Sequence, residues 1–146
     1  MPCSCSEVFG DGTKKVLVDG REIKALGIFK KDIHPAWEDR ANINGSELDA
    51  SKPLSMEALD THWESIVLGL IGEMIDVDDT ICGARVAVRN KMRSGFKFEI
   101  WLRDKNEKKA DEIRTKLVAM LGETQGSLKV NFRFGESEFI LDKRGK

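Results

Sequence analysis

An arginine and a lysine stand two residues apart in a segment of alternating polarity, Gly83–Lys91. Its even-numbered positions Ala84, Val86 and Val88 are apolar, whereas Arg85, Arg89 and Lys91 occupy odd-numbered positions. Successive side chains of a strand point to opposite faces, so Arg89 and Lys91 are expected to rise side by side from one face. Cationic groups in that arrangement could hold adjacent phosphates through charge-assisted hydrogen bonds. The alternative is a solvated sheet face, where charged side chains ordinarily lie.

Two further segments, Phe96–Arg103 and Leu128–Phe134, alternate in the same way. If their apolar sides also face the core, the opposite face collects bases and one aromatic ring. The expected set is Arg85, Arg89, Lys91, Lys97, Trp101, Arg103, Lys129 and Arg133, with Glu99 as its only acid. Bases of nucleic acids stack on exposed aromatic rings of this kind. The alternative for Trp101 is a tryptophan packed against a loop.

Trp37 and Glu38 are adjacent in a polar, turn-rich stretch that we interpret as a long loop over Lys31–Lys52. Long loops in compact domains often carry function. An indole offers an electron-rich face that attracts a cationic ring most strongly. The neighbouring carboxylate can accept hydrogen bonds from the N–H donors of a guanine edge. The pair could therefore stack a base and read its edge, or Trp37 could simply plug the end of the core.

Composition argues for one globular domain and against catalysis. The 146 residues are 40% hydrophobic and carry a formal net charge of −1, so an anionic ligand needs a local cluster of bases. His34 and His62 have no companions at metal-ligand or catalytic spacing, and no phosphate-binding glycine loop is present in the sequence. We expect no enzyme activity, no metal and no organic cofactor.

The cysteines and the hydropathy pattern predict a protein of the cytosol or the nucleus, and we expect it in the cytoplasm. Cys3, Cys5 and Cys82 are an odd count, and the first two are too close for a comfortable bridge. No apolar run approaches the roughly 20 residues that span a bilayer, and Met1–Gly10 lacks the apolar core of a signal peptide.

Short strands and two helices complete the expected domain. Residues Met1–Thr13 show no periodicity and are interpreted as a flexible lead-in, followed by one domain over residues 14–146. The pattern predicts strands over Lys14–Val18 and Glu22–Phe29 joined at Asp19-Gly20, a turn at Ser94-Gly95 and a last strand over Phe139–Leu141. The first helix would begin after Ser55 and carry an apolar stripe of Met56, Leu59, Trp63, Ile66, Leu70 and Met74, widened by Val67 and Ile71. Trp63 is therefore expected in the core.

A second helix is predicted from Asn106 to Leu121, where Gly122 ends it. Its apolar face carries Ala110, Ile113 and Leu117. Two amphipathic helices are the natural cover for the apolar face of the strands. The fold class is thus α+β, a curved antiparallel sheet with helices packed on its convex face and an open polar concave face.

Several motifs in order resemble the eukaryotic translation initiation factor 4E family. Phe29–Asp39 is similar to the family segment F-K-x-x-I-x-P-x-W-E-D, and Leu70–Glu73 to the L-I-G-E that ends a family helix. Cys82–Lys91 resembles the family strand C-G-A-x-V-x-V-R-x-K, and Ile100-Trp101 the I-W that follows. The resemblance covers about Leu26 to Gly122.

The resemblance implies binding of the 7-methylguanosine cap of mRNA in translation initiation. Trp37 would stack on the methylated guanine, Glu38 would accept from its edge, and Trp101 would lie beside the N7 methyl group. Arg89 and Lys91 would hold the phosphates. The convex face of the first helix would receive an initiation scaffold protein or an inhibitory binding protein, and the family's helix places Leu68 and Gly72 on that face.

Some residues depart from the family pattern. Met1–Ala25 contain no tryptophan, so the family's N-terminal strands and second stacking tryptophan are not expected in this chain. The loss of one stacking ring would cost about 1–3 kcal/mol. Ala87 stands where asparagine is common, and Glu64 where the docking face usually has leucine. The alternative function is therefore a protein-interaction module with impaired cap binding that acts through its convex helices.

Overall fold

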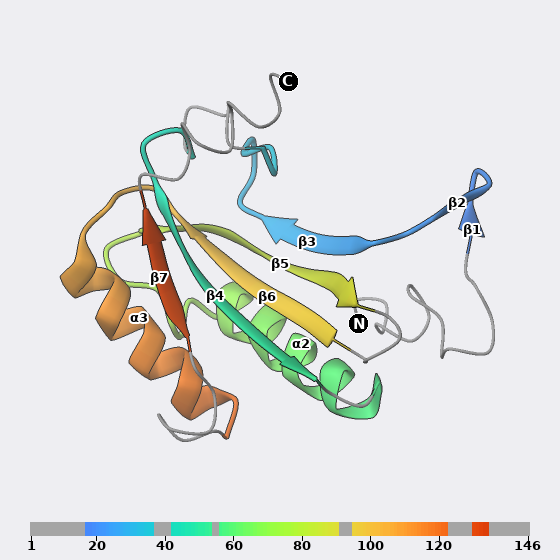
Figure 1. Cartoon of the computed structure of the whole chain (residues 1–146). Coiled ribbons are helices and arrows are strands. Elements are labelled where there is room, and N and C mark those ends of the chain that lie inside the picture. Colours follow the sequence, from blue (N-terminus) through green and yellow to red (C-terminus); the bar gives the residue numbers. More distant parts are fainter. Residues whose placement is uncertain (1–16, 37–41, 54–55, 91–94, 123–129, 135–146) are drawn as a thin grey trace.

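The computed structural model describes residues 17–36, 42–53, 56–90, 95–122 and 130–134. Seven strands and two helices lie in these ranges: β1 (Leu17–Val18), β2 (Arg21–Glu22), β3 (Ala25–Phe29), β4 (Ser46–Pro53), α2 (Met56–Ile71), β5 (Ile81–Asn90), β6 (Gly95–Leu102), α3 (Glu107–Met120) and β7 (Asn131–Phe134). Five of the strands form one curved, unclosed antiparallel sheet, and both helices lie on the same side of it (Figure 1). The predicted α+β class is confirmed.

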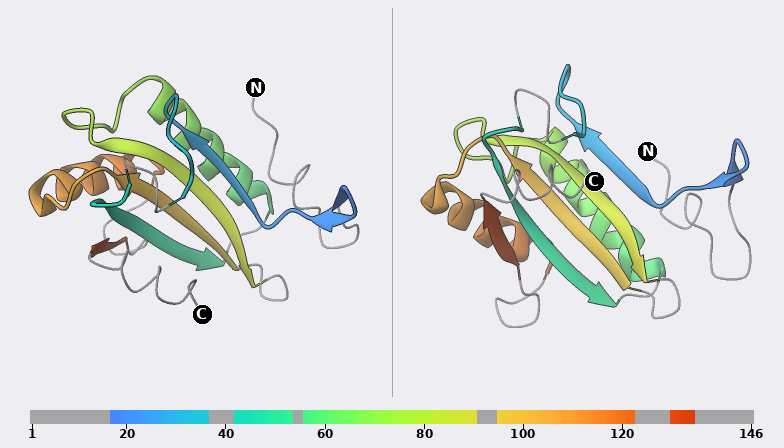
Figure 2. Two further views of the ribbon diagram at one scale, coloured as in Figure 1. Left: turned by 90° about the horizontal axis from the view of Figure 1, so that it is seen from above. Right: turned by 45° about the horizontal axis from the view of Figure 1, so that its top comes forward.

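The sheet order is β3-β5-β6-β4-β7, so the chain leaves β3 at one edge and returns as β4 beyond β5 and β6. The views of Figure 2 show this arrangement with the helices together on the outer curve. β5 and β6 are paired over almost their whole length, from Ile81↔Leu102 to Asn90↔Gly95. All of these pairings are antiparallel, so the end of β3 and the start of β4 lie at the same end of the sheet, with β5 and β6 between them.

The interpretation of Lys31–Lys52 as a single loop is wrong in its second half. Ser46–Pro53 is a strand, and it pairs with β6 from Ser46↔Leu102 to Pro53↔Gly95. Its sequence gives little sign of this, because only Leu48 and Ala50 are apolar on the helix side. Both are buried, which shows that packing against the core overrides the weak local preference for a strand.

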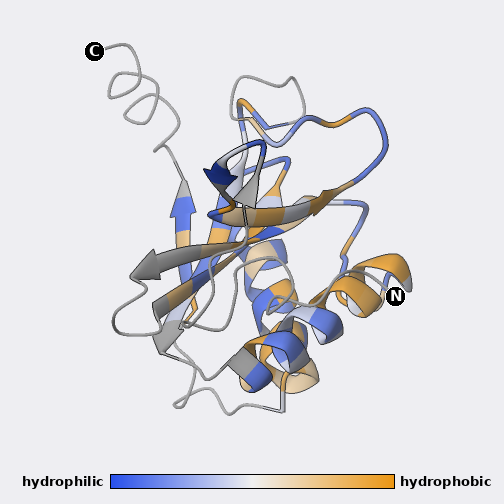
Figure 3. Cartoon of the chain, turned by 90° about the vertical axis from the view of Figure 1, so that its right-hand side faces the viewer, coloured by the Kyte–Doolittle hydropathy of each residue, from blue (hydrophilic) through white to orange (hydrophobic). Residues whose placement is uncertain are grey.

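The predicted alternation of buried apolar and outward-facing residues is confirmed for β5 and β6. Ala84, Val86, Phe96, Phe98, Ile100 and Leu102 form the core together with residues of both helices. Trp63 is 3% exposed, as expected from its place in the stripe of α2. The predicted stripe is wrong at its end, because the helix stops at Ile71 and both Ile71 and Met74 are 66% exposed. Figure 3 shows hydrophobic and hydrophilic residues in alternating bands along the helices.

Caps and turns fix the remaining elements. The side chain of Asn106 accepts a hydrogen bond from the backbone N–H of Lys109 at 3.0 Å and thereby caps α3, which ends before Gly122 at a φ of +71°. Asp19 and Gly20 have φ values of 52° and 76° and join β1 to β2. β3 instead pairs with β5, so it is not a continuation of that hairpin.

Asp76 organises the turn that leads into β5. Its Oδ1 accepts hydrogen bonds from the backbone N–H groups of Val77, Thr80 and Ile81 at 2.8 to 3.0 Å. Its Oδ2 receives the Lys30 ammonium at 2.8 Å. This carboxylate therefore ties the start of β5 to the chain that follows β3.

None of the helices in these ranges is long and apolar enough to cross a membrane. Ser55, the turn at Ser94-Gly95 and the last strand at Phe139–Leu141 lie wholly or partly outside the described residues. The domain limits of 14–146 after a lead-in at 1–13 stay a prediction.

Candidate functional site

Side chains on the concave face, away from the helices, lie in rows that run across the strands. Directly paired residues of neighbouring strands point to the same face. The first row is Phe29, Gly83, Trp101, Glu47 and Arg133, and the second is Gly27, Arg85, Glu99, Asp49 and Asn131. A third row carries Ala25, Ala87, Lys97 and Ser51. Trp101 thus stands on the predicted face, next to bases and acids.

Trp101 is covered rather than open. It is 1% exposed and packs with Cys82, Phe29 and Ile33 in a cluster separate from the main core. The Phe29 ring meets the indole edge-on, with centroids 5.2 Å apart and planes at 81°. Gly83 makes this possible, because a Cβ at that position would stand 2.4 Å from the Phe29 ring. The indole thus packs against residues of β3 and β5 as well as against Ile33 in the loop after β3, so it is neither an open stacking ring nor covered by a loop alone.

The expectation that Glu99 is the face's only acid is wrong. β4 adds Glu47 and Asp49 to the same face, and all three carboxylates are buried. Sequence reasoning missed them because β4 was interpreted as loop. The signal that could have found them is the alternation of Glu47 and Asp49 with Leu48 and Ala50.

Bases on this face are matched to these acids. The Arg133 Nε lies 2.6 Å from Asp49 Oδ2. Arg85 Nη1 and Lys97 Nζ each lie 3.9 Å from a Glu99 carboxylate oxygen. Glu99 Oε1 also accepts a hydrogen bond from Trp101 Nε1 at 2.8 Å. Arg103, which was expected here, lies beyond the end of β6 and pairs with Asp79 at 3.5 Å instead.

Glu47 is the least compensated of the three acids. Burial, followed by the neighbouring charge of Glu99, raises the pKa of Glu47 to about 7, although the Lys97 ammonium opposes the shift. Within the described part of the chain, its Oε2 has no hydrogen-bond donor. A protonated Glu47 hydrogen-bonds Glu99, which further favours the neutral acid.

The expected phosphate ligands are described only in part. Arg89 lies in β5, between the pairs Val88↔Phe96 and Asn90↔Gly95 where the register shifts, and its side chain lies outside the description. Lys91 and Lys129 also lie outside the described residues. From Gly83, which faces Trp101, to Arg89 the strand advances by roughly 20 Å.

Trp37 and Glu38 lie outside the described residues, but the chain on either side of them is firmly held. Asn42 is fully buried, and its Nδ2 donates hydrogen bonds to the carbonyl oxygens of His34 and Ala36 at 2.9 and 2.8 Å. These contacts bring the two ends of the 37–41 segment together. Ile33, four residues before Trp37, packs in the Trp101 cluster. The segment with Trp37 and Glu38 therefore starts from the end of the sheet where Trp101 lies.

Exposed apolar side chains gather near the end of α2 on the opposite side of the molecule. Leu68 is 49% exposed, and Gly72 is exposed one turn later, where its N–H donates to the Leu68 carbonyl at 2.9 Å. Ile71 also lines a small hollow of about 170 Å³ with Leu70 and residues of β3 and β5.

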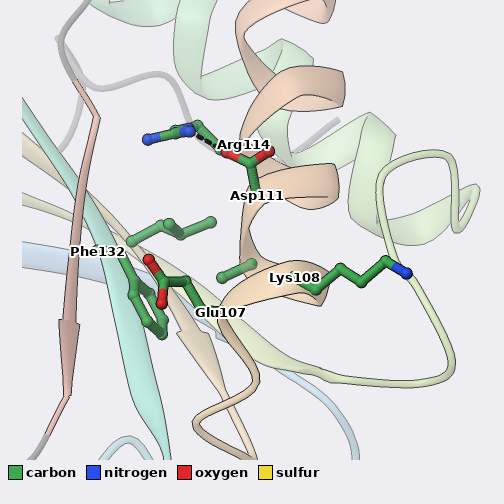
Figure 4. A pocket seen from close by; sticks show the side chains of 7 residues that line it. Glu107, Lys108, Asp111, Arg114 and Phe132 are labelled. Carbon is green, nitrogen blue, oxygen red and sulfur yellow. Dashed lines mark hydrogen bonds and ion pairs between the residues drawn. The ribbon is translucent and has the colours of Figure 1, made fainter.

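A larger hollow of about 480 Å³ lies between α3 and the strands β4 and β7. Figure 4 shows Glu107, Lys108, Asp111, Arg114 and Phe132 around it, with Arg114 and Asp111 joined in an ion pair. Its mixed charges favour no single ligand. Across the described ranges, no group of three or more His, Cys, Asp or Glu side chains is placed to hold a metal ion.

An open antiparallel sheet with both helices on its convex side, and with polar and aromatic side chains in rows on the concave side, defines an α+β binding fold. The family model for eukaryotic initiation factor 4E matches residues 19–143. The chain belongs to this family, so the resemblance is confirmed.

Relatives and solved structures agree with this assignment. The chain is 42% identical over 92 residues to eukaryotic translation initiation factor 4E1 of Drosophila melanogaster, a match that covers 62% of this chain and 34% of the relative. It is 34% identical over 95 residues to eukaryotic translation initiation factor 4E of Eremothecium gossypii, covering 64% of this chain and 44% of that protein. The chain thus spans less than half the length of these relatives.

Among solved structures, C. elegans eIF4E-3 in complex with the 4E-binding protein Mextli and a cap analog is similar at a TM-score of 0.69 and 27% identity. That match covers 87% of this chain and 69% of the other. The schistosome eIF4E complexed with m7GpppA and 4E-BP is similar at a TM-score of 0.67 and 28% identity, over 80% of this chain and 62% of that one.

Proposed function

We propose that this chain binds the 7-methylguanosine cap of mRNA in translation initiation, in the cytoplasm and without catalysing a reaction. Family membership supports the proposal, as do the solved relatives that carry a cap analog or m7GpppA. The single observation that carries it in this chain concerns the described residues that flank Trp37 and Glu38. Asn42 donates hydrogen bonds to the carbonyl oxygens of His34 and Ala36, and Ile33 packs in the Trp101 cluster.

The family resemblance supplies the proposed role of each residue. Trp37 stacks on the methylated base, whose positive charge strengthens the contact, and Glu38 accepts from the guanine edge. Trp101, which packs with Phe29 and Ile33, lies on the methyl side of the base. Arg89 and Lys91 hold the phosphates toward the other end of β5, so the ligand extends along the strand from base to phosphates.

Capture on immobilised 7-methyl-GTP tests the proposal. The unmodified chain should be retained and should elute with free 7-methyl-GTP but not with GTP. Arg89→Ala should weaken retention, and Glu38→Ala should abolish the preference for the methylated nucleotide. Lys116→Ala, an exposed change on α3, is the matched control and should behave like the unmodified chain. Failure of a demonstrably folded chain to bind would refute cap binding.

A second function, protein interaction through α2, is favoured by the exposed apolar side chains of Leu68, Ile71 and Met74. Both solved structures described above contain a 4E-binding protein, Mextli in one and 4E-BP in the other. Leu68→Asp should abolish co-purification with such a partner while leaving retention on 7-methyl-GTP unchanged. Glu57→Lys, at an exposed position at the other end of α2, is the control. Unchanged partner binding by Leu68→Asp would refute this role.

A further inference from the structure

Three acids are buried side by side on the concave face, and strand register explains how. Glu47 and Asp49 are two residues apart on β4 and therefore share a face. Asp49 stands directly opposite Glu99 of β6, and Glu47 directly opposite Trp101. Glu47 and Glu99 are consequently diagonal neighbours, a separation that long side chains can bridge. Their exposed fractions are each 6% and that of Asp49 is 2%.

The bases around these acids do not compensate all three equally. Asp49 has the close contact with Arg133 from β7, at 2.6 Å. Glu99 has the Trp101 indole N–H and the more distant Lys97 of β6 and Arg85 of β5. Glu47 faces Asp49 on its own strand, Glu99, Lys97 and Trp101 on β6, and Arg133 on β7, whereas the paired positions of β3 carry the uncharged Gly27 and Phe29.

Placing a third negative charge beside Glu99 and Asp49 in a buried position is unfavourable unless a proton neutralises it. The burial and neighbours of Glu47 raise its pKa to about 7, in agreement with this geometry. With Glu47 ionised, the three acids balance the three described bases of the face, Arg85, Lys97 and Arg133. With Glu47 neutral, the face gains one net positive charge.

We propose that Glu47 holds a proton that it shares with Glu99, and that the binding of a nucleotide's phosphates on the concave face is coupled to uptake of this proton. The coupling rests on the proposed cap-binding function. Protonation of Glu47 lets its carboxyl donate to Glu99, which loosens the hold of Glu99 on Lys97 and Arg85. Those two bases then interact more strongly with an anionic ligand. Because the Trp101 indole N–H donates a hydrogen bond to Glu99, protonation of Glu47 also changes the environment of that N–H.

The proton itself is tested in the ligand-free chain. The indole N–H signal of Trp101, assigned by its loss in Trp101→Phe, should shift between about pH 6 and pH 8 with a midpoint near the value of about 7. In Glu47→Gln the same signal should not titrate. The signal of Trp63, in the core on the opposite side of the sheet, is the internal control. A Trp101 signal that stays constant in the unmodified chain, or one that still titrates in Glu47→Gln, overturns the proposal.

The coupling is tested by the affinity for 7-methyl-GTP across the same pH range. Linkage of one proton makes binding tighter by at most about tenfold for each pH unit that the pH falls. Glu47→Gln should lose this part of the pH dependence and keep only the part due to titration of the nucleotide. Glu57→Gln, an exposed acid on α2, should retain the full dependence. Equal pH dependence in the unmodified chain and in Glu47→Gln overturns the coupling.

The two experiments distinguish failure of the shared proton from failure of cap binding. A Trp101 signal that titrates in a chain with no affinity for 7-methyl-GTP at any pH refutes the proposed function and the coupling, yet supports the shared proton. Binding of 7-methyl-GTP by a chain whose Trp101 signal does not titrate refutes the shared proton and leaves the proposed function standing.

Discussion

Glu47→Gln should make the chain more stable at alkaline pH and leave its stability at acidic pH almost unchanged. The glutamine has nearly the shape of the protonated acid and can donate to Glu99 as the protonated acid does. It cannot ionise in its buried position beside Glu99 and Asp49. The substitution therefore isolates the cost of a third negative charge on the concave face.

The magnitude and sign follow from the pKa of Glu47. In the unfolded chain its carboxyl loses its proton near pH 4.5, whereas burial and Glu99 raise the pKa in the folded chain to about 7. Between these values the folded chain binds the extra proton, so stability falls as the pH rises and the loss is complete above about pH 7. This difference in pKa corresponds to a loss of unfolding free energy of at most roughly 3 kcal/mol when Glu47 ionises.

Urea denaturation of both proteins at about pH 4, below the unfolded-state pKa of Glu47, and at about pH 8 measures the effect. The free energies of unfolding should agree at the acidic pH, and the variant should be more stable by about 1–3 kcal/mol at the alkaline pH. Asp60→Asn, on α2 and away from the concave face, should not change the pH dependence. An equal or lower stability of Glu47→Gln at the alkaline pH would refute the reasoning about these three acids.

Three further predictions test the fold, two of them with a control substitution. Trp63→Ala should cost about 3–5 kcal/mol of unfolding free energy in urea denaturation because it empties a buried site, whereas Ile71→Ala should change it by less than about 0.5 kcal/mol. Equal losses would contradict the described end of α2. Asp76→Ala should cost about 2–4 kcal/mol in the same assay, because three backbone N–H groups lose their acceptor, while Asp78→Ala should cost less than about 1 kcal/mol. Asn106→Ala should cost about 1 kcal/mol and reduce hydrogen-exchange protection in the first turn of α3; unchanged protection would contradict the cap.

Elements whose apolar residues recur at a regular spacing were predictable from the sequence. α3 begins at the predicted cap and ends before the predicted glycine, since its stripe and both end signals agree. β5 and β6 were found because they carry three and four apolar residues, respectively, at alternate positions. β4 was missed for the opposite reason: only two of its residues on the helix side are apolar, and a polar strand is stabilised here by pairing with β6 and β7 on either side.

The sequence predicted the residues that β5 and β6 contribute to the concave face, but not the residues that β3 and β4 place beside them. The sequence placed Trp101, Arg85 and Lys97 on the concave face, because alternation assigns a face to each strand residue. It could not show that Phe29 and Ile33 cover the indole, since that contact depends on how the chain leaves β3. It also could not place Glu47 beside Glu99, because their proximity arises from the pairing of β4 with β6.

The central claim is tested most directly by titrating the chain with 7-methyl-GTP, with GTP as the control, while recording tryptophan fluorescence. Cap binding predicts saturable quenching by the methylated nucleotide, much weaker quenching by GTP, and loss of the response in Trp37→Ala. A folded chain that shows no quenching, or the same quenching with both nucleotides, would contradict cap recognition by this sheet.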